Sequence, residues 1–584
     1  MKRFSVVMAF CVFAASTMLA QAGKAPGKKA VKSEANTEVM SELQAMKAAI
    51  AAQQKQIEQL QQQLSQRDQA LQQTQQQLSD AKSAAQQAQT TANEANTTAQ
   101  GAQASVADLK ATDNTFAQQI QEDQKRVGQL ESPTTIHYKG VTITPGGFLA
   151  AETVYRQRGT GSDINTSMNS INFPGAGGYH QSEFYGSGRQ SRISILGEGT
   201  LSWGKIGGYW EMDWLSSGTT SNNNQSNSYT NRQRQLFGQI ATNTGWTITG
   251  GQMWSLVTET KKGVDNRTEA TPMTIDPQYT VGFSWARQYG FRVAKNINNK
   301  VWIAGSIENA QTTFSARNAV ANFAFGQAGN SGGLYNAFNG NYSYNWSPDY
   351  IAKVVFEPGI GHYEIFGVAS LFRDRVYPNY ASTTLPKGSG AYEASTLGGG
   401  VGVNARVSLL KKRLDIGAHA LGGNGVGRYG TSGLPDVTVR PDGKLAKLRA
   451  GQALGTIEWH TPKIDIYGNA GVEYVGRYYN GTVGYGVPTL ATYGCDIEVQ
   501  PSANSGFAPG TPANCNADTR NVIEGTIGFW YKLYNGSKGR IQFGPQYSYL
   551  VRNTWAGAGA TAGTSAQPNA VNNMFFTSFR YYLP

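Results

Sequence analysis

From Val39 to Leu130, positions spaced alternately by four and three residues are mostly apolar, which is the repeat of a coiled coil. The polar exceptions are Gln53, Arg67, Thr74, Asp113 and Asp123. Between Ala81 and Ala102 every position of this stripe is alanine, so the seam is thin there. The repeat predicts an α-helical rod over residues 37–131 and does not decide between two and three strands. A single helix or a disordered linker rich in Gln and Ala is the alternative interpretation.

After Pro133 the period falls to two, the spacing of β-strands, and long polar connections alternate with tight turns. This alternation is typical of an outer-membrane barrel with short periplasmic turns and long external loops. Eight long connections are predicted near residues 157–188, 217–229, 255–285, 312–348, 373–394, 424–443, 479–518 and 553–569. Seven tight turns are predicted at residues 203–205, 242–245, 296–300, 358–361, 410–413, 461–463 and 534–539. Residues 132–584 are therefore predicted to form a transmembrane β-barrel of 16 antiparallel strands.

The alternation of side chains assigns the two faces of the clearest strands. Ile206 and Trp210 share one face, whereas Glu211 and Asp213 share the other. A soluble sandwich with one polar face has the same alternation, but the size of the segment favours a barrel. Aromatic residues at strand ends also suit the girdles of a membrane barrel. The predicted girdle residues are Trp210, Trp214, Trp246, Trp254, Trp459, Tyr547 and Tyr549.

The N-terminus carries Lys2 and Arg3, a short apolar run and then small residues up to Ala22. This is the pattern of a secretory signal peptide over residues 1–22, cleaved after Ala22. A membrane anchor is the alternative, although the run is short for a membrane span. Residues 23–36 are predicted to form a basic linker between the signal peptide and the rod.

The exported chain keeps two of its three cysteines, Cys495 and Cys515, because Cys11 leaves with the signal peptide. Two cysteines in an exported protein favour a disulfide bond. This bond would close a segment rich in Gly, Pro and Asn, so we predict that it lies in a loop. Two free thiols are the alternative.

Most of the formal net charge of +12 belongs to the predicted barrel. The signal peptide contributes +2, residues 23–36 contribute +3 and the rod contributes −4, which leaves +11 for residues 132–584. A basic chain often binds nucleic acid, but export and the scattered positions of the basic residues argue against that. We therefore predict no nucleic-acid partner.

The sequence contains no constellation typical of catalysis, so the protein is predicted not to be an enzyme. Residues 425–430 match Gly-x-Gly-x-x-Gly, but a Gly-Leu-Pro sequence follows instead of a helix, which favours a flexible loop over a dinucleotide site. The histidines fall on separate strands or loops without ligand spacing, so neither a metal site nor a cofactor is predicted. They are His137, His180, His362, His419 and His460.

Three short segments, together with the architecture, resemble the DcaP-like porins of bacterial outer membranes. They are residues 251–255 (Gly-Gln-Met-Trp-Ser), 306–309 (Ser-Ile-Glu-Asn) and 539–549, which begins Gly-Arg-Ile-Gln-Phe-Gly-Pro. The resemblance implies a cleaved signal, a periplasmic coiled coil, a 16-stranded barrel and a homotrimer held by both parts. It also implies passive uptake of small anionic solutes such as dicarboxylates. The chain departs from this pattern in ending on Pro584 and in the length of its rod.

Basic residues aimed into the lumen are the candidates for anion selectivity, because a ladder of Arg and Lys lowers the barrier for anions. By strand alternation, the inward residues are predicted to be Arg192, Arg292, Lys353, Arg449, Arg540 and Arg580. Arg232 and Arg234 are ambiguous, since they share parity with Leu236 and Ile240.

Long loops in such barrels often fold inward, so basic residues of the connection at 255–285 are candidates for a constriction. They are Lys261, Lys262 and Arg267. Each of the basic residues could instead face lipid headgroups or balance a carboxylate across the lumen, for which the candidates are Glu211, Asp213, Glu308 and Glu473.

Two classes of function fit these predictions. The first is a porin in the outer membrane of a Gram-negative bacterium, surrounded by lipid and lipopolysaccharide, with its coiled coil in the periplasm and a preference for small anions. The second is a structural tether, in which the barrel anchors a periplasmic rod that reaches peptidoglycan. A porin that prefers sugars or peptides is a third possibility, motivated by the many Tyr and Trp residues.

Overall fold

The computed structural model describes residues 135–215, 230–328, 341–501 and 510–584. The predicted signal peptide with its cleavage site after Ala22, the basic linker and the coiled coil lie outside these ranges. Within the ranges, no helix is both long and apolar enough to cross a membrane. The described chain is built from β-strands, with short 3-10 helices in the connections.

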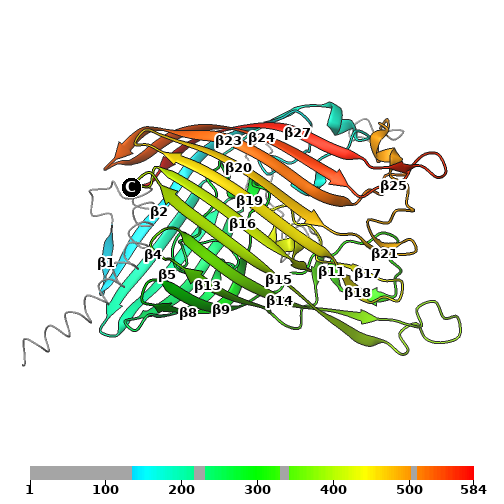
Figure 1. Cartoon of the computed structure of the whole chain (residues 1–584), viewed down its shortest axis with the longest axis horizontal. Helices are drawn as coiled ribbons and strands as arrows, with labels where there is room; N and C mark the ends of the chain where they lie inside the picture. The colour runs from blue at the N-terminus through cyan, green and yellow to red at the C-terminus, as the bar shows by residue number, and fades with distance from the viewer. Residues whose placement is uncertain (1–134, 216–229, 329–340, 502–509) are drawn as a thin grey trace, which may run out of the picture. The chain divides into compact units, whose positions relative to one another are not determined.

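Sixteen strands form a closed antiparallel barrel, in which strands that follow one another around the wall also follow one another in sequence (Figure 1). The first strand closes onto the last, with Phe148 opposite Tyr582 and Arg156 opposite Met574. The predicted number of strands is confirmed. The wall strands are β2 (Val141–Arg156), β4 (Arg192–Leu201), β5 (Gly204–Asp213), β6 (Arg232–Thr242), β7 (Trp246–Trp254), β8 (Arg287–Ile297), β9 (Val301–Glu308), β13 (Asp349–Phe356), β14 (His362–Val376), β15 (Tyr392–Leu409), β16 (Leu414–Asn424), β19 (Arg449–His460), β20 (Ile464–Val475), β23 (Thr519–Gly536), β24 (Gly539–Thr554) and β27 (Asn569–Tyr582).

Shorter elements lie in or beside the connections. The short strands are β1 (Ile136–Tyr138), β3 (Glu183–Ser187), β10 (Phe323–Ala324), β11 (Gly326–Ala328), β12 (Asn341–Ser343), β17 (Val437–Val439), β18 (Leu445–Lys447), β21 (Tyr478–Asn480), β22 (Val483–Tyr485), β25 (Gly557–Ala558) and β26 (Ser565–Ala566). The 3-10 helices are η1 (Met168–Ser170), η2 (Gly177–His180), η3 (Pro277–Tyr279), η5 (Gly427–Tyr429) and η6 (Tyr493–Asp496). Of these strands, β1, β3 and β10 extend the wall sheet by pairing with β2 or β14.

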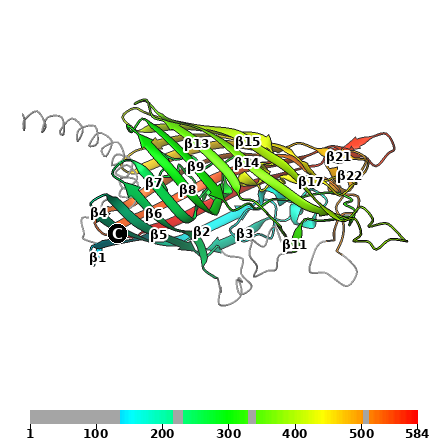
Figure 2. The same cartoon turned by 90° about the horizontal axis from the view of Figure 1, so that it is seen from below.

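Tight turns lie at one end of the barrel, and the long connections gather at the other end, near β11, β17 and β21 (Figure 2). All seven predicted turns join paired strands. The chain also ends at the turn end, because Tyr582 pairs with Arg540 directly after the turn between β23 and β24. In the turn between β8 and β9, Asn298 and Asn299 have φ values of 56° and 52°, a left-handed conformation that asparagine tolerates.

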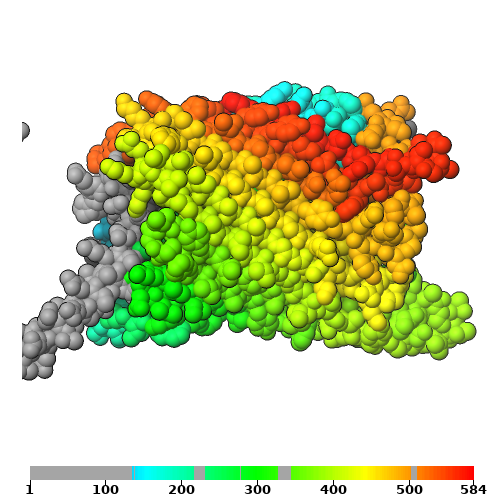
Figure 3. All heavy atoms as spheres, viewed as in Figure 1, coloured from blue at the N-terminus to red at the C-terminus, as the bar shows by residue number. Residues whose placement is uncertain are grey.

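The outer wall of the barrel is apolar; Figure 3 shows one side of it. Along β13, the side chains of Tyr350 and Val354 are exposed on the outside. The side chain of Asp349, the first residue of the strand, is buried inside the barrel. On other strands Val401 is 65% exposed and Ile527 is 61% exposed. A soluble sandwich would leave such side chains in water, whereas a bilayer covers them. The closed ring and its apolar outside therefore exclude the sandwich and identify a membrane-embedded barrel.

Most of the predicted girdle residues lie on this outer wall. Trp210, Trp246, Trp459, Tyr547 and Tyr549 are between 37% and 46% exposed. Trp254 was wrongly predicted to belong to the girdle, since it is only 4% exposed and packs inside the barrel against Phe283 and Trp285. The reason is its place at the end of β7, where the chain turns inward.

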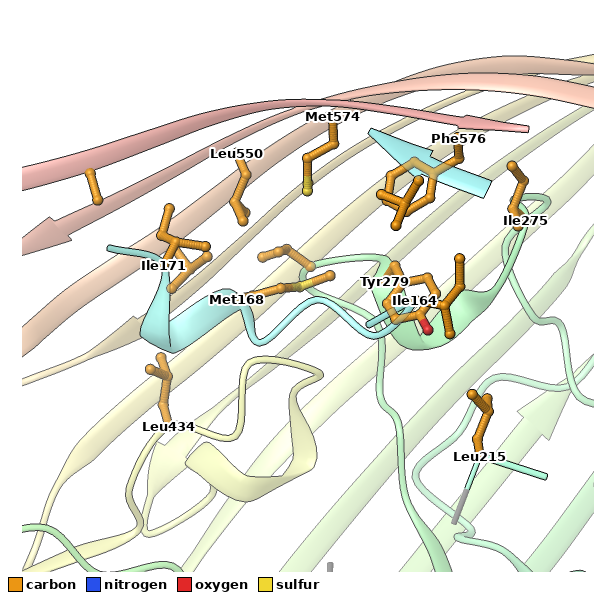
Figure 4. Close-up of a cluster of buried hydrophobic side chains, with 14 of the residues drawn as sticks. Ile164, Met168, Ile171, Leu215, Ile275, Tyr279, Leu434, Leu550, Met574 and Phe576 are labelled. Carbon is orange, nitrogen blue, oxygen red and sulfur yellow. The ribbon is translucent and has the colours of Figure 1, made fainter. Parts of the chain in front are cut away.

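A hydrophobic core lies inside the barrel against the inner face of β20, β23, β24 and β27 (Figure 4). Five connections supply it: Ile164 and Met168 follow β2, Leu215 follows β5, Tyr279 follows β7, Leu434 follows β16 and Tyr485 follows β20. Tyr279 stacks on Phe576 of β27, with ring centroids 5.9 Å apart. This side of the interior is therefore filled by packed side chains from the long connections.

Candidate pore and its charged lining

Residues 255–286, between β7 and β8, fold into the barrel and cross it; we call this segment the inward connection. Lys353 on β13 donates a hydrogen bond to the carbonyl oxygen of Thr258 at 2.7 Å. Arg580 on β27 donates a hydrogen bond to the carbonyl oxygen of Ile275. Because β13 is the eighth wall strand and β27 the sixteenth, these two contacts lie on opposite sides of the ring. The inward connection therefore spans the lumen from wall to wall.

Glutamates of the wall hold the inward connection by accepting hydrogen bonds from its backbone. Each pair is separated by 2.8–2.9 Å: Glu308 with the amide of Leu256, Glu364 with Thr260, Glu458 with Met273, Glu524 with Val281 and Glu473 with Gly282. Backbone amides in a barrel interior need such partners. Glu308 and Glu473 thus bind the connection, which differs from the predicted role of counter-charge.

The predicted constriction residues lie on a small hairpin within the inward connection. Its two arms are joined by backbone hydrogen bonds from Lys261 to Thr268 and from Ala270 to Glu259, both 2.7 Å long. Lys262 is buried, whereas Lys261 and Arg267 are partly exposed. The guanidinium of Arg267 lies 4.9 Å from the ring centroid of Tyr209 on β5. The hairpin therefore carries partly exposed basic groups within the barrel.

Five of the six predicted selectivity residues face the interior, and three of these hold the inward connection. Besides the contacts of Lys353 and Arg580 described above, Arg292 donates hydrogen bonds to Asn266 Oδ1 at 2.8 Å and to the carbonyl of Trp254 at 2.6 Å. Lys353 and Arg580 also form ion pairs of 2.7 Å, with Glu364 and Glu152 respectively. All three are at most 7% exposed, so they offer little charge to water in the lumen.

The other predicted residues differ from one another. Arg540 faces inward with its guanidinium 4.1 Å from the ring centroid of Tyr582. Arg449 was wrongly predicted to face inward: it is exposed on the outer face of β19, whose buried residues are Ala450, Gln452 and alternate residues after them. The error arises because the outward residues next to Arg449 are Gly and Ala, which give little contrast between the two faces.

Arg232 and Arg234 both point into the interior because β6 contains a bulge. The pairing of β6 with β5 shifts by one residue beside Glu211, which explains why alternation along β6 left both arginines ambiguous. Arg232 lies 2.7 Å from Asp213 Oδ2. Arg234 lies between Asp213 at 2.7 Å and Glu211 at 3.0 Å.

Arg192 lies beside these two arginines and, like Arg232, is partly exposed. Its guanidinium is 3.5 Å from Glu211 Oε1 and 5.2 Å from the ring centroid of Phe148, and 23% of its side chain is exposed. It lies opposite Asp213 in the register of β4 and β5. Of the predicted selectivity residues that face the interior, Arg192 is the most exposed.

Arg287, the first residue of β8, was missed by the sequence analysis. Its guanidinium lies 5.2 Å from the ring of Trp254 and 4.9 Å from that of Trp285, and it is partly exposed. Among the described residues it has no ion pair within 4 Å, although it acts electrostatically on the carboxylates of Glu211 and Asp213. The only signal in the sequence was that Arg287 follows Trp285 by two positions, which places both side chains on one face of a strand.

Arg192, Arg232, Arg234 and Arg287 together form what we call the arginine cluster. Glu211 and Asp213 are its nearest carboxylates, and Asp276 of the inward connection is a third that acts on Arg192 and Arg234. Four guanidinium groups therefore face three carboxylates. Aromatic rings and a low-dielectric wall strengthen the field of such a cluster on a passing ion.

Two further predictions concern the connections. Cys495 and Cys515 form a disulfide bond, as predicted, with Cα atoms 4.6 Å apart in the connection between β20 and β23. The Gly-x-Gly-x-x-Gly segment is part of a connection that contains η5, as the absence of a following helix predicted. There Tyr429 donates a hydrogen bond to Asp349 on β13 at 2.7 Å, so this segment also packs inside the barrel.

This closed 16-stranded antiparallel barrel with an apolar outside has the fold of the outer-membrane channels. It is similar to the crystal structure of the outer membrane channel DcaP of Acinetobacter baumannii, with a TM-score of 0.51 and 14% identity over 77% of this chain and 99% of that one. The fold resemblance predicted from the sequence is thereby confirmed. OmpT of Vibrio cholerae and an anion-selective porin from Comamonas acidovorans match at TM-scores of 0.39, with 10% identity each. No family model and no curated protein sequence matches the chain.

Proposed function

We propose that this protein is an outer-membrane porin that lets small hydrophilic solutes diffuse passively through its barrel. The observation that carries the proposal is a closed ring whose outer wall is apolar and whose inner wall is lined with charged and polar side chains. A pore needs such an inner wall, because polar groups along it interact with water and with ions that lose part of their hydration shell. The inward connection narrows the lumen and so limits the size of the solute.

A preference for anions is the second part of the proposal. It is supported by the arginine cluster, in which Arg192 and Arg287 are partly exposed, and by the charge of +11 on residues 132–584 within a total of +12. The predicted constriction residues Lys261 and Arg267 add partly exposed basic groups on the inward connection. Lys353, Arg292 and Arg580 contribute by holding this connection in place. Small dicarboxylates, each with two negative charges, are the solutes that this lining suits best.

Liposome swelling tests the choice of solute directly. Vesicles that contain the folded protein are mixed with a four-carbon dicarboxylate or with a neutral solute of the same size. We expect faster swelling with the dicarboxylate. Equal rates for the two solutes would favour a porin for sugars or peptides, and the anion preference would then be abandoned.

We further propose that the porin is a homotrimer held by its barrel and by the coiled coil predicted over residues 37–131, in a membrane with lipopolysaccharide outside. The prediction is that light scattering of the protein in detergent gives the mass of three chains. A chain lacking residues 23–131 should dissociate more readily on dilution. A single chain in both samples would contradict the trimer.

A structural tether is a second candidate, and the hydrophobic core inside the barrel favours it. That core fills one side of the interior with residues from five connections, as expected of an anchor that conducts nothing. In this case the rod would bind peptidoglycan and the barrel would only hold it in the membrane. A silent barrel combined with co-sedimentation of residues 23–131 with peptidoglycan would support the tether.

A further inference from the structure

A group of ionisable side chains outside the arginine cluster lies at the turn end of the barrel. Asp415 is the second residue of β16, Glu458 lies near the end of β19 and His460 is the last residue of β19. Asp415 is directly opposite Glu458 in the register of the two strands, which places His460 diagonally across from Asp415. One nitrogen or oxygen atom from each of these three side chains lies within 4.8 Å of the others.

The spacing of these atoms suits the ligands of one metal ion, and the same atoms form ion pairs when the imidazole is protonated. His460 Nε2 is 3.5 Å from Asp415 Oδ2 and 3.6 Å from Glu458 Oε2. Two ligands about 2.0–2.1 Å from a tetrahedral Zn²⁺ ion are separated by roughly 3.3–3.4 Å. Accordingly, His460 Nε2 and Asp415 Oδ1 are buried and have no hydrogen-bond partner in the described part of the chain.

A second carboxylate orients the histidine. His460 Nδ1 lies 3.3 Å from Asp465 Oδ1 on β20, and Lys532 on β23 is 2.8 Å from the carboxylate of Asp465. When Nδ1 carries the proton and donates it to Asp465, the lone pair of Nε2 points toward Asp415 and Glu458. A metal-bound histidine is usually held in this way by a carboxylate on its other nitrogen.

Glu458 has further neighbours, among them the basic residues Arg406 and Lys261. Glu458 uses its Oε1 atom to accept the amide of Met273 at 2.9 Å, so Oε2 is available. Arg406 is 3.8 Å from that Oε2 atom but makes its closer contact, 3.0 Å, with Glu259. The side chains of His460 and Asp415 are 24% and 14% exposed, so water can reach the site and supply a fourth ligand.

We propose that Asp415, Glu458 and His460 bind one divalent transition-metal ion, with Zn²⁺ the best fit to one imidazole and two carboxylate ligands. Spacing along the chain gave no sign of this site, because strand pairing brings its ligands together. On the orientation proposed above, the ion would sit at the periplasmic mouth and add positive charge there. The site does not depend on whether the barrel conducts.

The test measures zinc on the full-length folded protein in detergent. The protein is incubated with ZnCl₂, freed of excess metal and analysed for zinc, and its affinity is measured by competition with a chromogenic chelator. We expect one Zn²⁺ per chain, and a loss of affinity of roughly 10-fold or more in Asp415→Asn, His460→Gln and Asp465→Asn. His180→Gln is the matched control, because His180 also lies beside a carboxylate, 3.6 Å from Glu498, but is 44% exposed on a long connection.

Each outcome decides the proposal. Wild-type protein that keeps no zinc, or zinc that Asp415→Asn leaves unchanged, would overturn it and leave an ion-pair network only. Folded barrels change their mobility on gels when they are heated, and a variant without this shift has not folded. In that case, X-ray absorption at the zinc edge of the wild-type protein is the deciding measurement. One nitrogen with oxygen ligands at about 2.0 Å supports the site, whereas two or more nitrogen ligands contradict it.

Discussion

Lys353 on β13 and Glu364 on β14 form a 2.7 Å ion pair whose two side chains are completely buried inside the barrel. Both partners also bind the inward connection, since Lys353 donates to the carbonyl of Thr258 and Glu364 accepts the amide of Thr260. A charged residue predicted to attract solute is therefore one of the anchors of the segment that narrows the lumen.

Replacing Lys353 with Ala is expected to destabilise the barrel and loosen the inward connection. Removing one partner of a buried ion pair costs about 3–5 kcal/mol, because the other charge is left without compensation. The temperature at which the folded band disappears on gels should fall, and channel currents should become larger and noisier. Lys411→Ala, in the turn between β15 and β16, is the control and should behave as wild type. Unchanged stability and currents in Lys353→Ala would count against the anchor.

Replacing Arg192 and Arg287 together with Ala is expected to reduce anion selectivity and leave stability nearly unchanged. Both guanidinium groups are partly exposed in the arginine cluster, and Arg287 has no ion pair among the described residues. Reversal potentials in a KCl gradient measure the effect. Arg449→Ala removes the same charge from the outer wall and serves as the control. Equal reversal potentials for the double variant and the wild type would show that the arginine cluster does not set selectivity.

Anion selectivity is expected to rise as the pH falls from 8 to 5. Burial within the barrel raises the pKa of Glu269 to about 7 and that of Asp265 to about 6, and both residues belong to the inward connection, outside the membrane-crossing strands. Each carboxyl is charged above its pKa and neutral below it, so the connection loses negative charge as the pH falls. Reversal potentials recorded at each pH measure this, and Glu269→Gln should flatten the upper part of the curve. An anion selectivity that decreases as the pH is lowered would contradict a role for Glu269 and Asp265.

Removing the disulfide by Cys495→Ser and Cys515→Ser is expected to lower thermal stability and leave selectivity intact. The bond closes a segment with a sequence separation of 20, for which the loss of chain entropy corresponds to about 3 kcal/mol. The carbonyl of Cys495 accepts a hydrogen bond from the amide of Gly175, so the connection between β2 and β4 should also loosen. Protease digestion of these connections measures the loosening. Loss of anion selectivity in the double variant would mean that the connections set it.

The strand number and the seven turns could be predicted because each depends on local patterns, namely alternation of faces and turn residues. The faces on which Arg449 and Trp254 lie could not be predicted in this way. Small neighbours conceal the face of Arg449, and a change of direction after β7 takes Trp254 inside. A bulge in β6 likewise reverses parity between Arg234 and the residues that follow it.

The roles of the lumen charges depend on contacts between distant segments, which no local pattern records. Lys353 meets Thr258 across 95 positions of sequence, and Arg580 meets Ile275 across 305. Alternation correctly predicts that these basic side chains point inward. Only the folded barrel shows that the inward connection covers them.

The proposed function requires that the barrel conducts small ions in spite of the hydrophobic core packed inside it. Single-channel recording of the folded full-length protein in a planar bilayer, with a KCl gradient, tests this most directly. We expect discrete current steps and a reversal potential displaced toward that of chloride. A bilayer that stays silent although folded protein has inserted, or a reversal potential displaced toward that of potassium, would contradict it.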